Sequence, residues 1–322
     1  MASDLAPIGI STYARISHLQ RTISALQKNT LAEQSELFIF SDAAKPGDGE
    51  RVTAVRSYLR TIKGFKVVHI FERESNSRTA NNRGGLKLLL DRFGKVIFLE
   101  EDVITAPGFL SFMNQALEEY RNNQRVFAIA GYCPPIGANQ YIHADAFLLP
   151  SCNFWGLATW KDRFDQVRMK TPVTEVFKTI GNPFCLASYM KMGPDIPYMF
   201  LLDAQGKLDA GDIKFSFEMW KKKSYLLVPT VSLSTNIGFD GSGAHCGTET
   251  KYVSEMSTSL GDHFHLPKDP ELSPILIRRL SEFRSEGSKL FWLPKIYVEF
   301  ARFTRYTIKQ KMLTLLATKN KS

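Results

Sequence analysis

Short apolar runs alternate with amphipathic segments along the first part of the chain, and this alternation constrains the fold more than any other feature. Strands are expected at 6–12, 35–43, 65–73 and 95–102, and helices at 17–29, 47–62, 77–93 and 108–122. Strands that alternate with helices of this length form βαβ units, in which right-handed crossovers join parallel strands. The pattern therefore predicts an α/β fold with a mostly parallel central sheet flanked by helices.

The pattern becomes irregular after about Phe127. A strand is expected at 125–132, an aromatic-rich segment at 147–167, a helix at 211–225, an extended segment at 226–234 and a glycine-rich loop at 236–248. A basic helix with aromatic residues follows Pro294. We expect one domain over 1–265, with a donor half at about 1–125 and an acceptor half at about 126–265, and a basic helical extension over 266–322.

Composition places the chain among globular proteins. Its 322 residues are 44% hydrophobic and 23% charged, which suffices for a sizeable core. No apolar run reaches the roughly 20 residues of a membrane span, and the N-terminal sequence lacks the pattern of a secretory signal. No two cysteines form a C-x-x-C pair, so we expect neither a zinc site nor a disulfide framework. A cytoplasmic protein is the expectation.

Positive charge is concentrated at the C-terminal end. Residues 271–322 hold eleven Lys and Arg against four Asp and Glu, a net +7 of the chain's +9. A basic tail on a nearly neutral body argues against a general nucleic-acid binder and predicts a local contact with an anionic partner. Two interpretations of the helix from Lys295 to Leu316 stay open: it lies on an anionic membrane surface, or it docks on the domain with a solvated basic face.

Three consecutive acids, Glu100, Glu101 and Asp102, directly follow the apolar run 96–99, and Asp42 follows the second predicted strand. Ligands of open α/β sheets bind beyond the carboxyl ends of the strands. Carboxylates gathered there repel one another unless a cation lies between them, and Mg²⁺ or Mn²⁺ bridging a diphosphate meets that need. The alternative is that the acids only stabilise the start of the next helix.

Several motifs together resemble a known family. They are "PIGISTYARISHLQRTISAL", "FIFSDA", "NNRGG", "VIFLEEDVITAPGFLSFMNQAL" and "DAGDIKFSFEMWKKKSYLLVPTVSLSTNIGFDGSGAHC". In this order they are similar to glycosyltransferases with the GT-A fold, family 2-like, in the branch whose metal motif reads E-E-D or E-D-D. Bacterial enzymes of surface-polysaccharide synthesis belong to that branch. The resemblance covers roughly Ile8 to Cys246.

The resemblance implies a metal site and a donor site. Asp102 matches the direct metal ligand, Glu101 matches the neighbour that contacts the donor sugar or orients the metal, and His245 matches a histidine that completes the metal shell or contacts the diphosphate. A structural role for His245 is the alternative. Further donor-binding positions are implied at Tyr13 and Arg15 for base and ribose, at Asp42 for the nucleobase, at Arg83 for the diphosphate and at Trp155 for the sugar.

Two of these implied donor positions have ordinary alternatives, because Arg83 suits a solvated helix start and Trp155 suits a core. A catalytic base is expected at Asp212, with Asp209 as the second candidate, since an inverting transfer needs a carboxylate to accept the proton of the attacking hydroxyl. Gly211 stands where relatives carry Trp, and either aspartate also suits a helix N-cap.

The sequence thus predicts an inverting, metal-dependent hexosyl- or N-acetylhexosaminyltransferase. It would use Mn²⁺ or Mg²⁺ and a nucleotide-diphosphate sugar, with UDP favoured, and act on a glycan or lipid-linked glycan at the inner face of the cell membrane. No nucleic-acid partner is expected. A nucleotidyltransferase is one alternative, although "STYARISHL" lacks its glycine-rich basic loop. A non-catalytic sugar-binding domain derived from the fold is another.

Overall fold

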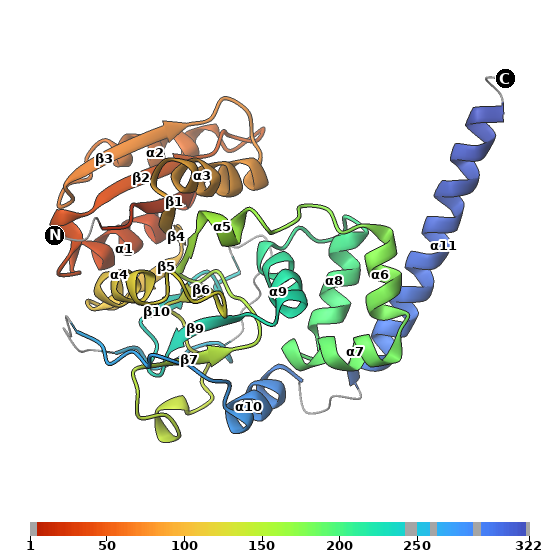
Figure 1. Cartoon of the computed structure of the whole chain (residues 1–322). Helices are drawn as coiled ribbons and strands as arrows, with labels where there is room; N and C mark the ends of the chain where they lie inside the picture. Colours follow the sequence, from red (N-terminus) through yellow and green to blue (C-terminus); the bar gives the residue numbers. More distant parts are fainter. Residues whose placement is uncertain (1–4, 242–249, 258–262, 286–290, 320–322) are drawn as a thin grey trace. The chain divides into compact units, whose positions relative to one another are not determined.

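The chain is divided between two units in the computed structural model, which describes residues 5–241, 250–257, 263–285 and 291–319, with side chains up to 310 (Figure 1). The first, here the sheet unit, comprises residues up to 166 together with 224–273. The second, here the helical unit, comprises 167–223 and the residues from 274 onward. Segment 167–223 therefore groups with the C-terminal helices, while the expected division at 265 stays a prediction.

The sheet unit is built on a mixed eight-stranded sheet with the order β3-β2-β1-β4-β8-β6-β9-β7. Strands β3, β2, β1 and β4 are parallel, β8 is antiparallel to both β4 and β6, and β9 is parallel to β6 but antiparallel to β7. This confirms the predicted α/β fold and adds that the sheet is mixed beyond β4. The strands are β1 Ile8–Thr12, β2 Glu36–Ser41, β3 Val67–Glu72, β4 Lys95–Glu100, β6 Val126–Ala130, β7 Ala146–Leu149, β8 Leu157–Trp160 and β9 Tyr225–Pro229.

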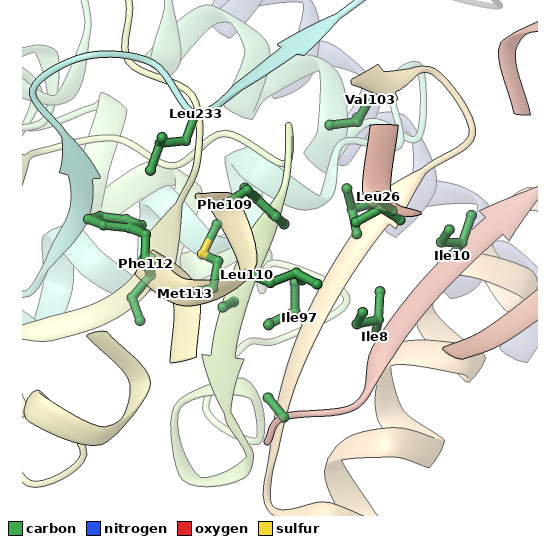
Figure 2. Packing of buried hydrophobic residues seen from close by; sticks show 14 of the residues in the cluster. Ile8, Ile10, Leu26, Ile97, Val103, Phe109, Leu110, Phe112, Met113 and Leu233 are labelled. Atoms are coloured by element: carbon green, nitrogen blue, oxygen red, sulfur yellow. The ribbon is translucent and has the colours of Figure 1, made fainter. Parts of the chain in front are cut away.

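The helices of this unit fall where the amphipathic segments predicted them. They are α1 Ile16–Gln27, α2 Gly49–Leu59, α3 Arg78–Phe93 and α4 Phe109–Glu119, with a short α5 at Lys161–Phe164. Side chains alternate between the two faces of a strand. Ile8 and Ile10 of β1 therefore share one core with Ile97 of β4 and with residues of α1, α2 and α4 (Figure 2).

The opposite face of the sheet carries phenylalanines and is covered by α3. A side chain at Gly9 of β1 would collide with Phe98 of β4 and Leu89 of α3, and one at Gly85 of α3 would collide with Phe40 of β2. Helix and sheet approach so closely here because both glycines lack a Cβ. The ends of α3 are fixed by local chemistry. The Ser77 hydroxyl accepts from an amide of the first turn, and Gly94, at φ 75°, ends the helix in the left-handed conformation.

The helical unit contains α6 Val173–Ile180, α7 Pro183–Tyr189, α8 Ile196–Ala204, α9 Gly211–Lys222, α10 Pro274–Arg284 and α11 Trp292–Lys319. Aromatic rings form its core, with Phe200 of α8 4.4 Å from Phe217 of α9 and 5.5 Å from Tyr189 of α7 between ring centroids. Helices α9 and α11 confirm the two helices expected in these regions. Helices α6, α7 and α8 had no counterpart among the sequence-based expectations, whereas α10 lies in the C-terminal extension that was expected to be helical. Among the described residues no helix is long and apolar enough to cross a membrane.

Candidate active site

The predicted acid run lies at the point where the strand order of the sheet changes direction. From β1 the chain moves to β2 and β3 on one side, and β4 then pairs with the other side of β1. The carboxyl ends of β1 and β4 therefore border the crevice in which open α/β sheets bind ligands. Residues 12–15 leave β1 at this crevice, and residues 100–102 leave β4 beside them.

One arginine holds two of the three acids. The Arg15 Nε donates to Glu101 Oε1 at 2.7 Å, and its Nη2 donates to Asp102 Oδ2 at 2.7 Å. Glu101 Oε2 accepts two further hydrogen bonds, from the Thr12 hydroxyl and the Tyr13 amide, each at 2.6 Å. Burial lowers the pKa of Arg15, but the two carboxylates raise it by more, so the guanidinium stays charged. Both oxygens of Glu101 are thus committed to protein donors.

The third guanidinium nitrogen of Arg15, Nη1, makes neither of these contacts. It is buried and has no hydrogen-bond partner within the described part of the chain. A buried guanidinium N–H without an acceptor costs free energy, and a phosphate oxygen is the acceptor that matches it best. The arginine therefore holds the acids in place and has an N–H left for an anionic ligand.

Glu100 differs from its two neighbours. Its Oε1 accepts from the Asn82 side chain of α3 at 2.8 Å, so it faces the helix that covers the other side of the sheet. Burial and the nearby charge of Asp102 together raise the pKa of Glu100 to about 7, against the lowering effect of Arg78. Glu100 is therefore partly protonated near neutral pH, whereas Glu101 is paired with Arg15.

The segment after residue 233 encloses Asp102. Strand β10, Ser234–Asn236, pairs antiparallel with β5, Val103–Thr105, and the Ile237 amide donates to the Asp102 carbonyl at 2.8 Å. A Cβ at Gly238 would collide with the Asp102 carboxylate, so only glycine allows this approach. The His18 Nε2 of α1 lies 3.0 Å from Asp240 Oδ2 and holds the far end of the segment.

The residues around Asp102 fit a divalent cation held by a single protein oxygen. Asp102 Oδ2 faces Arg15, while Oδ1 has, among the described residues, only the Asn236 Nδ2 at 3.3 Å. The Asn236 orientation is fixed, because its Oδ1 accepts from the Gly238 amide at 2.7 Å. Within the described ranges no group of three His, Cys, Asp or Glu side chains is arranged to hold a metal. One carboxylate oxygen completed by phosphate and water is an ordinary magnesium site.

The predicted ligand His245 lies outside the described residues. The remaining donor candidates lie in three places. Trp155 belongs to an aromatic cluster, in which Tyr132, Phe239 and Tyr252 lie edge-on to its indole with centroids 4.5, 5.4 and 5.6 Å away. Because Phe239 directly follows Gly238, the same segment joins this cluster to the surroundings of Asp102. An aromatic cluster beside a carboxylate suits a sugar ring.

Asp42 and Tyr13 lie at the neighbouring strand ends. The buried Asp42 carboxylate accepts from the Ala43 and Ser77 amides at 3.0 Å and from the Asn76 side chain at 3.1 Å. It therefore shapes the loop that leads into α3. The Tyr13 hydroxyl donates to Asp48 Oδ2 at 2.7 Å and accepts from the Lys45 amide at 2.9 Å.

Arg83 lies on α3 with its guanidinium 5.5 Å from the Phe164 ring. The glycine that follows it in "NNRGG" by two positions, Gly85, makes its close approach to Phe40 of the sheet. The packing between helix and sheet thus explains this glycine without a ligand.

The two candidate bases belong to the helical unit and differ in their surroundings. Asp209 is 46% exposed, and the Lys214 Nζ lies 2.6 Å from its Oδ1. Asp212 lies in the first turn of α9, and burial raises its pKa, against the lowering effect of Arg284. Its Oδ1 accepts from the Ile213 amide at 2.9 Å. A raised pKa makes a carboxylate a better proton acceptor, which is the property a general base needs.

Sequence reasoning missed the residues that assemble the site. Thr12, Asn236 and Gly238 contact the acids or their partners, yet none is charged and none forms a metal motif. The only signal for Asn236 and Gly238 was their place in the "NIGFDGSG" motif. The role of Arg15 as a bridge between two acids had no sequence signal, because the acids lie 86 and 87 positions after it in the chain.

No protein-family model and no curated protein matches the chain. Among solved structures it is similar to S. aureus TarS, at 10% identity and a TM-score of 0.40 over 70% of this chain and 35% of that chain. It is also similar to S. aureus TarS 1–349, at 9% identity and a TM-score of 0.37 over 69% of this chain and 57% of that chain. A third similar structure is GalNAc-T7 with UDP, GalNAc and Mn²⁺, at 11% identity and a TM-score of 0.43 over 71% of this chain and 43% of that chain.

The chain thus spans between about a third and somewhat over half of these proteins. At such scores the likeness carries no argument about the site. The α/β fold is established by the sheet itself.

Proposed function

We propose that the chain is an inverting glycosyltransferase that uses a nucleotide-diphosphate sugar and a divalent cation. The observation that carries the proposal is the arrangement around Asp102. At the switch point of the sheet, a buried carboxylate offers one oxygen, and a guanidinium beside it has a buried N–H with no described acceptor. A carboxylate oxygen suits the cation and a guanidinium N–H suits phosphate, so together they suit a diphosphate with its metal.

The donor is assigned to the sheet unit. Asp102 would hold Mn²⁺ or Mg²⁺, with His245 as the proposed second ligand, and the bound cation would neutralise charge on the departing diphosphate. Arg15 would donate its Nη1–H to a phosphate oxygen, and Glu101 keeps that guanidinium in place through its contact with Nε. Tyr13 and Asp42 are proposed to border the base and ribose, with UDP favoured, and Arg83 to lie toward the diphosphate. Trp155 and its aromatic cluster are proposed to receive the donor sugar.

Proton transfer is assigned to the helical unit. As the acceptor hydroxyl attacks the anomeric carbon, the bond to the diphosphate oxygen breaks and the hydroxyl proton passes to a carboxylate. We propose Asp212 for this role, because burial raises its pKa and because no ion pair to it is found in the described residues. Asp209 is the second candidate, and its contact with Lys214 makes it the weaker base. The acceptor is proposed to be a glycan or lipid-linked glycan.

One observation favours a second candidate function, a sugar-binding domain without catalysis. Arg15 already forms an ion pair with each of Glu101 and Asp102, so both acids have a cationic partner without a metal ion. This alternative predicts that the affinity for sugar or nucleotide does not depend on Mn²⁺. It also predicts that no nucleotide is released from the donor.

Thermal-shift screening of UDP-, dTDP- and GDP-sugars, with and without Mn²⁺, tests the proposal. We expect stabilisation by at least one nucleotide sugar that depends on Mn²⁺, followed by slow release of the free nucleotide diphosphate. Asp102→Asn should lose both effects. The matched control is Asp91→Asn, which changes a carboxylate in a surface ion pair with Lys87 and Lys161. A nucleotide sugar that stabilises wild type and the Asp102 variant equally would refute the assigned role.

A further inference from the structure

Helix α11 is docked in the helical unit through one of its faces. Ile296 and Phe303 are buried on it, and the ring of Phe177 in α6 lies 5.8 Å from that of Phe303 and 5.4 Å from that of Phe300. Residues three, four and seven positions apart share one side of a helix, so the spacing from Ile296 to Phe303 defines a single buried stripe. The sequence left open whether this helix lies on an anionic membrane surface or docks with a solvated basic face, and in the structure it is docked through this stripe.

The charges of α11 are separated between its two sides. Glu299 is the only acid in the sequence of α11, and it lies in the buried stripe with its side chain 3% exposed. Its Oε1 accepts from the Lys207 ammonium at 2.7 Å and from the Gln205 amide at 2.8 Å, and its Oε2 accepts from Arg302 at 3.1 Å. Burial thus removes the single negative charge from the outward side. Arg302 shares Glu299, whereas Arg305 and Lys309 have no further acid in the sequence of α11.

The outward side combines these cations with large apolar groups. Tyr297, Val298, Tyr306 and Ile308 are each more than half exposed, at 53, 53, 52 and 54%. Arg305 and Lys309 lie exposed among them. In the described part of α11, the side turned away from the docked face therefore mixes apolar and cationic groups.

We propose that this outward face of α11 binds the surface of an anionic lipid bilayer, with the helix lying in the plane of the interface. Exposed aliphatic side chains and tyrosines interspersed with arginines and lysines, on a side of the helix without an acid, suit the boundary between lipid headgroups and acyl chains. A second copy of the chain would bring its own cations against these and is disfavoured by like charge. A nucleic acid would need the cations but would leave Ile308 and Val298 in water.

The proposal does not depend on sugar transfer, although it would place the chain at the surface where lipid-linked acceptors lie. Each Lys or Arg beside an anionic leaflet strengthens binding roughly fivefold. The doubly substituted variant Arg305→Gln and Lys309→Gln should therefore bind such vesicles roughly 30-fold more weakly than wild type. The variant Tyr297→Ser and Ile308→Ser should also bind more weakly, because it removes apolar burial and no charge.

The experiment is co-sedimentation of the full chain with vesicles of phosphatidylglycerol and phosphatidylcholine in equal parts, beside vesicles of phosphatidylcholine alone. The matched control is Lys63→Gln with Lys66→Gln, which removes the same charge from exposed positions of the sheet unit. We expect salt-sensitive binding to the anionic vesicles alone, unchanged in the control and reduced in both α11 variants. Circular dichroism and a nucleotide thermal shift on each variant distinguish a lost surface from a lost fold or a lost donor site.

Three results would overturn the proposal. The first is failure of the wild-type chain to sediment with anionic vesicles. The second is equal sedimentation of the two α11 variants and the Lys63 and Lys66 control. The third is a concentration-dependent dimer, measured by analytical ultracentrifugation, that the Tyr297 and Ile308 substitutions dissociate while vesicle binding is absent, since a second copy would then be the occupant.

Discussion

Two adjacent glycines of α3 should respond to alanine in opposite ways. Gly84 is exposed, and a Cβ built there meets nothing within 4 Å. Alanine stabilises a helix interior relative to glycine by about 1 kcal/mol, because it loses less backbone entropy on folding. Gly84→Ala is therefore expected to raise the free energy of unfolding by about 1 kcal/mol.

Gly85 has the same backbone environment but a different neighbour. A Cβ there would lie 2.6 Å from Cδ2 and 2.7 Å from Cγ of Phe40, about 1 Å closer than carbon atoms pack. Phe40 has little room to move, because its ring lies 5.1 Å from that of Phe71 and 6.3 Å from that of Phe98. Overpacking of this kind costs about 1–3 kcal/mol and outweighs the helix gain. Gly85→Ala is expected to lower the free energy of unfolding by up to about 2 kcal/mol.

Urea denaturation followed by tryptophan fluorescence measures both variants, each serving as the control for the other. Equal stabilisation by both would refute the reasoning, because it would mean that Phe40 yields and that α3 is not held by this contact. A second outcome is equally informative. If Gly85→Ala left stability unchanged but abolished nucleotide binding, the glycine would serve the ligand rather than the packing of α3 on the sheet.

Three further predictions concern charged groups. Because burial raises the pKa of Glu100 from 4.5 to about 7, wild-type stability should fall as pH rises through that window. Glu100→Gln should then be more stable by up to about 3 kcal/mol above pH 7 and no more stable below pH 4.5, and a gain independent of pH would contradict this. Asp212→Asn should be more stable than wild type at neutral pH, because burial also raises the pKa of this carboxyl. It should transfer sugar at least about a hundredfold more slowly, whereas the rate of Asp209→Asn should stay within a few-fold of wild type. A transfer assay that ranks the two variants the other way would exchange their roles. Arg15→Met should lose about 3–5 kcal/mol, because it leaves buried carboxylates unpaired. It should also bind Mn²⁺ more tightly without nucleotide, in an electron paramagnetic resonance titration, because the guanidinium no longer competes for Asp102, and unchanged Mn²⁺ affinity would oppose that competition.

Local periodicity accounts for the part of the fold that sequence predicted. The four strand–helix repeats from Ile8 to Glu119 follow from patterns within each segment, and their helices fall close to the expected bounds. The pairing of β5 with β10 could not be predicted in this way, because each strand has three residues and the partners lie about 130 positions apart. That pairing brings Asn236 and Gly238 to Asp102, so the walls of the site escaped prediction along with it.

Charge pairing escaped prediction for a related reason. Sequence identified Arg15, Glu101 and Asp102 as site residues, but a sequence does not say which cation an acid will meet first. In the structure both acids form ion pairs with Arg15, and Glu299 of α11 forms an ion pair with Lys207. In both cases the decisive information is the side of an element on which a charge lies, and this depends on tertiary packing.

Calorimetric titration of UDP into the protein, with and without Mn²⁺, tests the central claim most directly. The account predicts that Mn²⁺ strengthens UDP binding at least tenfold in wild type and in Asp91→Asn, and that Asp102→Asn removes this gain. Equal UDP affinity with and without Mn²⁺ in wild type, or a Mn²⁺ effect that survives in Asp102→Asn, would contradict it.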